Sequence, residues 1–146
     1  MKTFLFDTST LIAALIKSHP KQSLALPWLQ RVKTGKDKGV ISAHSLAELY
    51  AILTTFPAKP RRISPQEAQQ LIAQNILDVF EVISLSEQDY VSVINHLSES
   101  GIMGGVTYDA LILEAAIKAK VDQVITLNKK DFQRVYPDFA DKIISP

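Results

Sequence analysis

The sequence contains no cysteine and no apolar run long enough to cross a membrane. The absence of cysteine excludes disulfide bonds and metal sites built on thiolates. A membrane span would need roughly 18 or more consecutive apolar residues, so we expect no membrane association and a cytoplasmic location. The formal net charge is only +1, so the overall charge does not indicate a class of partner.

The sequence also has no internal repeat, no low-complexity tract and no stretch that resembles a linker. Its 146 residues are 47% hydrophobic and 21% charged, which is the composition of an ordinary globular protein. A chain of this length can bury a sizeable core. We therefore expect a single domain over residues 1–146.

Short apolar segments with the composition of buried strands alternate with segments of helical periodicity. The predicted strands are residues 4–6, 40–42, 79–85 and 123–127. The predicted helices are residues 8–16, 20–33, 45–56, 86–97 and 109–120, with another starting at 64 and a short turn at 131–137. This alternation predicts an α/β fold, a three-layer α/β/α sandwich around a central, mostly parallel sheet.

Two helix starts carry a capping signature. Ser64 and Ser86 can each cap a helix, and an acidic residue stands three positions later, Glu67 and Asp89. Gly101 is a residue type that often ends a helix, so we expect the second of these helices to stop there.

Side chains with oxygen ligands follow each of the strands that should form the centre of the sheet. Asp7 ends the first strand, Glu48 lies early in the helix after the second, and Asp109 begins a helix after a glycine-bearing loop. Asn128 follows the fourth strand, and Asp131 comes three residues later. Singly, each could be a cap, a turn residue or the wet side of a helix. Parallel topology brings them all to the carboxyl edge of the sheet.

Three carboxylates gathered at this edge would repel one another at neutral pH, and a divalent cation would remove that repulsion. Oxygen ligands without histidine or cysteine suit Mg²⁺ or Mn²⁺, which can supply hydroxide for attack on phosphorus. The hydroxyl residues Thr8, Ser9 and Thr10 follow Asp7 directly. We expect them to orient Asp7 and to donate to phosphate oxygens at a helix N-terminus.

Four segments together resemble the motifs of a known family. The segments FDTSTLIAAL, SLAELYAIL, GGVTYDALILEAA and VITLNKKDF are similar, in order and spacing, to the four motifs of PIN-domain ribonucleases. Among these, the chain looks most like the VapC toxins of toxin–antitoxin pairs. The similarity extends from Lys2 to Phe132.

The resemblance implies roles for individual residues. Asp7, Glu48 and Asp109 match the three main acidic metal ligands and catalytic residues of the family. Asn128 stands where many members have a fourth aspartate, which implies weaker metal binding, and Asp131 is the other possible oxygen donor.

The neighbouring hydroxyl residues are implied to position the substrate. Ser9 matches a small hydroxyl residue beside the first aspartate, and Thr8 precedes it. Thr107 lies two residues before Asp109, where it could contact the site or cap the helix, and we favour the cap.

The resemblance further implies a Mg²⁺- or Mn²⁺-dependent endoribonuclease that acts on RNA as a homodimer and is bound by a VapB-like antitoxin. Two basic clusters are then candidates for phosphate contact. They are Lys59, Arg61 and Arg62, and Lys129 and Lys130. The three histidines, His19, His44 and His96, have no metal-site spacing and are interpreted as structural or surface residues.

Three other interpretations are considered at this point. An aspartyl-phosphate phosphatase would need an aspartate two positions after Asp7, where Ser9 stands, so we discount it. A PIN nuclease of RNA maturation or decay would act without an antitoxin. The chain could also be a PIN module that only binds RNA or protein, and the one feature that favours this interpretation is Asn128.

Overall fold

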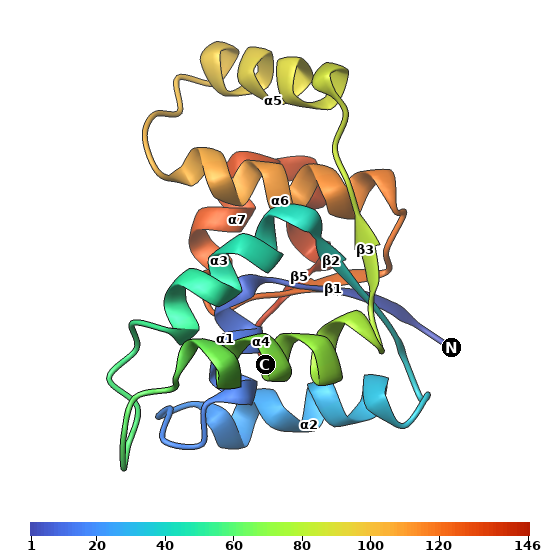
Figure 1. Cartoon of the computed structure of the whole chain (residues 1–146). Coiled ribbons are helices and arrows are strands. Elements are labelled where there is room, and N and C mark those ends of the chain that lie inside the picture. The colour runs from blue at the N-terminus through green and yellow to red at the C-terminus, as the bar shows by residue number, and fades with distance from the viewer.

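The computed structural model describes all residues, 1–146, and contains one parallel five-stranded sheet with the order β3-β2-β1-β4-β5 (Figure 1). The strands are β1 (Thr3–Phe6), β2 (Lys38–Ser42), β3 (Glu81–Ile83), β4 (Gln123–Ile125) and β5 (Ile143–Ile144). Every neighbouring pair is parallel. The predicted parallel α/β architecture is therefore confirmed.

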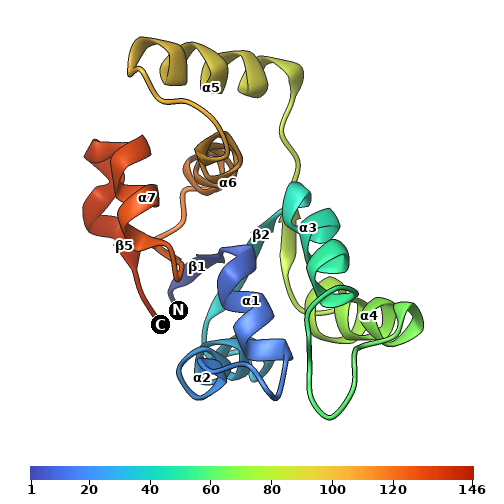
Figure 2. The same cartoon turned by 90° about the vertical axis from the view of Figure 1, so that its left-hand side faces the viewer.

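Helices cover both faces of this sheet and make the two outer layers (Figures 1 and 2). On one face lie α1 (Thr8–Leu15), α2 (Gln22–Lys33), α3 (Ala43–Leu53) and α4 (Pro65–Ile72), which continues into the π-helical turn η1 (Ala73–Leu77). On the other lie α6 (Val106–Lys118) and α7 (Lys129–Val135), which is followed by the 3-10 turn η2 (Pro137–Lys142), and α5 (Glu87–Glu99) packs on the outer side of α6. No helix is long and apolar enough to cross a membrane.

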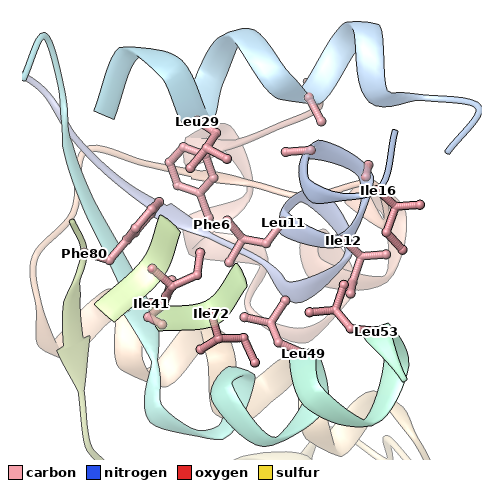
Figure 3. Close-up of a cluster of buried hydrophobic side chains, with 14 of the residues drawn as sticks. Phe6, Leu11, Ile12, Ile16, Leu29, Ile41, Leu49, Leu53, Ile72 and Phe80 are labelled. Carbon is pink, nitrogen blue, oxygen red and sulfur yellow. The ribbon is translucent and has the colours of Figure 1, made fainter. Parts of the chain in front are cut away.

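The central strands β1, β2 and β4 are mostly apolar because both faces of the sheet are buried there. Along β1, Phe4 and Phe6 point into the core beneath α1 to α4, and Leu5 points into the core beneath α5 to α7. Val124 and Ile125 of β4 divide between the two cores in the same way. Figure 3 shows Phe6 of the sheet among side chains of the first group of helices. This two-sided burial is the reason that the strands read as continuous apolar runs.

Both predicted capping boxes are present. The Ser64 hydroxyl accepts from the backbone N–H of Glu67, whose carboxylate accepts from the Ser64 backbone N–H. Ser86 and Asp89 make the same reciprocal pair at the start of α5. The helix also stops where expected, since Gly101 has a φ of 66°, a left-handed value that ends the helical path.

Three expectations about elements were wrong. The segment predicted as a turn at 131–137 is largely helix α7, and β5 was not predicted at all. Helix α6 begins at Val106 and not at Asp109, because Gly104, with a φ of 80°, turns the chain into the helix earlier. Thr107 is consequently inside the helix, the N-cap is Gly105, and no side chain caps it.

Strand β1 is the point at which the chain changes direction across the sheet. From β1 the chain adds β2 and β3 on one side, and then returns to place β4 and β5 on the other. The crevice beyond the carboxyl ends of β1 and β4 is where ligands bind in open parallel sheets. Asp7 follows β1 and Thr126 follows β4, so both lie at this position.

Candidate functional site

Asp7 is buried at the carboxyl end of β1, with 3% of its surface exposed. It occupies the N-cap position of α1, but its side chain makes no capping hydrogen bond. Instead, Oδ2 accepts one bond from the Ser9 hydroxyl at 2.6 Å and one from the Thr126 hydroxyl at 2.7 Å. The interpretation of Asp7 as a simple helix cap therefore fails, and the expected orientation by Ser9 is present.

The two hydroxyls that hold Asp7 are themselves held by backbone amides. The N–H of Leu127 donates to Ser9 Oγ at 3.1 Å, and the N–H of Asn128 donates to Thr126 Oγ1 at 2.9 Å. Each hydroxyl thus accepts from the backbone and donates its one proton to the carboxylate. Both bonds fall on Oδ2, which leaves Oδ1 of Asp7 free of side-chain donors.

Glu48 projects from α3 and is held by a different hydroxyl. The Thr8 hydroxyl lies 3.0 Å from Glu48 Oε1 and 2.9 Å from Ser45 Oγ. Because a carboxylate can only accept, Thr8 donates to Glu48 and accepts from Ser45. Thr8 therefore orients Glu48 and not Asp7, and at 4% exposure it is not available to a phosphate.

Thr10 and Thr107 lie outside this network. The Thr10 hydroxyl is fully buried and donates to the carbonyl of Ile125 at 3.0 Å, so it joins α1 to β4. The expectation that it donates to phosphate oxygens was wrong, because its hydroxyl points back into the sheet. Thr107 makes no side-chain hydrogen bond in the site, and the cap that we favoured for it is absent.

Asp109 lies in the first turn of α6 and brings a further carboxylate to the site. Burial, together with the negative charges of Asp7, Asp131 and Glu48, raises its pKa to about 7. Burial also raises the pKa of Asp7; the bonds from Ser9 and Thr126 oppose this, and the charge of Glu48 adds to it. Four carboxylates from four elements therefore act on one another at this edge of the sheet.

The structure brings Asp131 to the cluster more clearly than Asn128. Asp131 lies in the first turn of α7 and is one of the charges that raise the pKa of Asp109. Asn128 is the N-cap residue of α7, and its side chain makes no capping bond. Its backbone N–H serves the site through Thr126.

The side chains of the acidic cluster are of the chemical type that binds a hard dication. The donors are carboxylate oxygens, and the raised pKa values of Asp7 and Asp109 reflect an environment that disfavours their negative charge. No group of three or more His, Cys, Asp or Glu side chains converges closely enough to form a complete chelating set. Carboxylates are donors of the kind that Mg²⁺ takes, and Mg²⁺ keeps several waters and binds through one or two of them.

Thr126 is the functional residue that sequence reasoning missed. It lies at the end of the apolar run QVITL, where a threonine is common for β-propensity alone. Its hydroxyl reaches Asp7 only because β1 and β4 pair side by side. The available signal was its position at the carboxyl end of a strand predicted to neighbour the first.

Of the two basic clusters, one lies beside the site and one does not. Lys129 and Lys130 begin α7, directly after Asn128, and are exposed. Arg61 forms an ion pair with Glu67 at 2.6 Å, and its loop lines a pocket with Leu15 at the far end of α1. Since α1 has eight residues, about 12 Å of helix separates that pocket from Asp7.

Comparison with known proteins identifies the family. The PIN domain family matches residues 4–137. The chain belongs to the PIN domain family. It is 33% identical over 107 residues to Ribonuclease VapC40 of Mycobacterium tuberculosis, a match that covers 73% of this chain and 72% of that protein.

Solved structures of PIN proteins share the fold. VapBC2 from Rickettsia felis, bound to a DNA fragment from its promoter, aligns with a TM-score of 0.65 at 22% identity over 99% of this chain and 97% of that one. The sarcin–ricin loop cleaving toxin VapC20 of Mycobacterium tuberculosis aligns with a TM-score of 0.63 at 16% identity, over 83% and 86%. These similarities support the three-layer α/β/α fold of the PIN chain.

Proposed function

We propose that this PIN protein is a Mg²⁺- or Mn²⁺-dependent endoribonuclease, the VapC-like toxin of a type II toxin–antitoxin pair. The observation that supports the proposal is that the charges of Asp7, Asp131 and Glu48, from three other elements, raise the pKa of Asp109 in addition to its burial. A relative named ribonuclease, one-third identical over most of the chain, supports RNA as the substrate.

Asp7, Glu48 and Asp109 would hold the metal, with Asp131 or Asn128 as a further oxygen donor. When bound, such a dication lowers the pKa of a coordinated water and neutralises charge on the phosphate. The protein's own part is positional: Ser9 and Thr126 fix Oδ2 of Asp7, and Thr8 fixes Oε1 of Glu48. Lys129 and Lys130 would contact flanking phosphates without reading sequence.

The test is cleavage of labelled RNA by the purified protein with Mg²⁺, with Mn²⁺ and with excess EDTA. We expect products only with metal, and none from Asp7→Asn. Full activity in EDTA, or equal cleavage by the variant, would overturn the hydrolase assignment. An RNA-binding module without catalysis is the second candidate, because Asn128 removes one family carboxylate and no chelating triad converges. It predicts RNA retention without metal-dependent products.

The toxin role adds a VapB-like antitoxin and a homodimer to the proposal. Relatives of the same fold, including VapBC2, support an antitoxin partner. We expect a short reading frame for the antitoxin directly upstream of the gene, and growth arrest on expression that co-expression of that frame relieves. A solitary gene together with harmless overexpression would favour a PIN nuclease of RNA maturation or decay.

A further inference from the structure

Two aromatic side chains from different helices stack at the rim of the acidic cluster. His44 of α3 and Tyr108 of α6 have ring centroids 5.4 Å apart and planes only 4° from parallel. This separation is typical of offset stacking. The pair therefore joins the first turns of the two helices that carry Glu48 and Asp109.

The stacked pair is directly connected to the candidate ligands. His44 Nε2 lies 3.7 Å from Glu48 Oε1, one helical turn away on α3. Tyr108 immediately precedes Asp109, whose carboxylate is under the influence of Asp7 and Glu48. A nucleotide whose phosphate occupied the acidic cluster would place its neighbouring base within reach of these rings.

Exposure distinguishes this pair from the other stacked pairs of the protein. Tyr108 is 53% exposed, and the His44 side chain is 29% exposed. The comparable pair His96–Tyr136 is half-buried, and the Tyr136 hydroxyl lies 3.2 Å from Glu114. Tyr108 makes no such bond, so its ring and hydroxyl are both open to a ligand.

We propose that His44 and Tyr108 form a stacking platform for an unpaired nucleobase beside the phosphate that a metal ion would hold at the acidic cluster. This inference rests on the proposed ribonuclease function and adds to it the two residues that would contact a base. Base–aromatic stacking tolerates any base identity, because every base has a π-face. A base within a duplex is already stacked on its neighbours, so the platform selects unpaired over paired RNA.

The experiment is steady-state cleavage of a labelled, unstructured RNA that the wild type cuts at a mapped position. Tyr108→Leu removes the aromatic face and should raise KM about tenfold, with kcat changed less than about twofold. Tyr108→Phe keeps the ring and should restore KM. Tyr50→Leu is the matched control, since Tyr50 is an aromatic residue on α3 that is 45% exposed and takes no part in the stack.

A second substrate separates stacking from mere helix packing. The same RNA with abasic residues on both sides of the cleaved bond offers no base to stack, so wild type and Tyr108→Leu should then have the same KM. A tenfold difference that persists on the abasic RNA, or a KM unaffected by Tyr108→Leu on the intact RNA, would overturn the platform.

Direct binding makes the two proposals distinguishable. Fluorescence anisotropy with Ca²⁺ in place of Mg²⁺ measures the affinity of labelled oligoadenylate and of an abasic oligomer of equal length, and a gel of the same samples checks that neither is cut. Preferential binding of oligoadenylate that Tyr108→Leu abolishes supports the platform even if no RNA is cut, an outcome that overturns the nuclease alone. Cleavage without this preference overturns the platform alone, and absence of both binding and cleavage overturns both.

Discussion

The Thr126 hydroxyl donates to Oδ2 of Asp7 at 2.7 Å, although 119 positions of sequence separate the two residues. The contact exists because β1 and β4 are neighbours and both end at the same edge of the sheet. Ser9 donates to the same oxygen from the first turn of α1. Two hydroxyls thus fix Oδ2 of Asp7, and Oδ1 has no side-chain donor.

Replacing Thr126 by valine should weaken metal binding by about 10- to 100-fold, the usual effect of losing a partner that orients a ligand. Mg²⁺ titration of the cleavage rate measures this, and Thr126→Ser should restore it. The matched control is Thr10→Val, since Thr10 is also a fully buried threonine with a single hydrogen bond toward β4. That variant should lose stability while its Mg²⁺ dependence stays unchanged. An unaltered Mg²⁺ titration for Thr126→Val would contradict the role assigned to this hydroxyl.

Asp7→Asn should lower the rate of cleavage by more than about 100-fold, because it removes a ligand and not merely the partner of one. The amide oxygen can still accept from Ser9 and Thr126, so the fold should be kept. Since burial and Glu48 both raise the pKa of Asp7, loss of its charge should leave the thermal transition unchanged or raise it. Calorimetry in EDTA checks this, and a markedly lower transition would contradict it.

Asp109 should make the free energy of unfolding depend on pH in the absence of metal. Its pKa rises from an ordinary 3.8 to about 7 in the folded protein, so the folded state holds a proton that the unfolded state releases. The favourable contribution is fully present below about pH 4 and is lost as the pH rises through about 7. Urea denaturation in EDTA should therefore show higher stability at pH 5 than at pH 8. Asp109→Asn should reduce this difference, and an unchanged difference would argue against the assigned pKa.

The roles of Asp131 and Asn128 can be distinguished by adding a carboxylate at position 128 and, in a second variant, removing the one at position 131. Asn128→Asp restores a carboxylate where many PIN proteins have one and should lower the Mg²⁺ concentration needed for half-maximal cleavage. Asp131→Asn removes a charge that raises the pKa of Asp109, so the pH midpoint of Asp109 should fall. If Asp131 is the further oxygen donor, Asp131→Asn also raises the Mg²⁺ requirement. An unchanged requirement assigns that position to Asn128.

Much of the fold could be predicted because local signals agree with the tertiary structure. The capping boxes at Ser64 and Ser86 depend only on residues three positions apart, and the strands are apolar because both faces are buried. β5 could not be predicted, because it consists of two residues whose strand conformation comes from pairing with β4. Helix α7 was missed because only Phe132 and Val135 of its residues are buried, which leaves little periodic signal.

The candidate site also contains residues that could be predicted from the sequence and residues that could not. Asp7, Glu48 and Asp109 follow predicted elements at positions that chain order and parallel topology bring together, so their proximity could be inferred. The hydroxyl of Thr126 and the ring of His44 could not, because each acts through a contact with a distant element. Their functional meaning depends on side-chain direction, which sequence spacing does not specify.

The backbone N–H of Thr126 donates to the carbonyl of Ile144 at 3.0 Å. The short final strand therefore supports the site from a distance. It contributes no ligand to the acidic cluster, but it fixes the backbone of Thr126, whose hydroxyl holds Asp7. If this chain acts as the proposed toxin, bacteria that survive its forced expression should include some with a stop codon just before Ile143, as well as some with mutations of Asp7, Glu48 or Asp109.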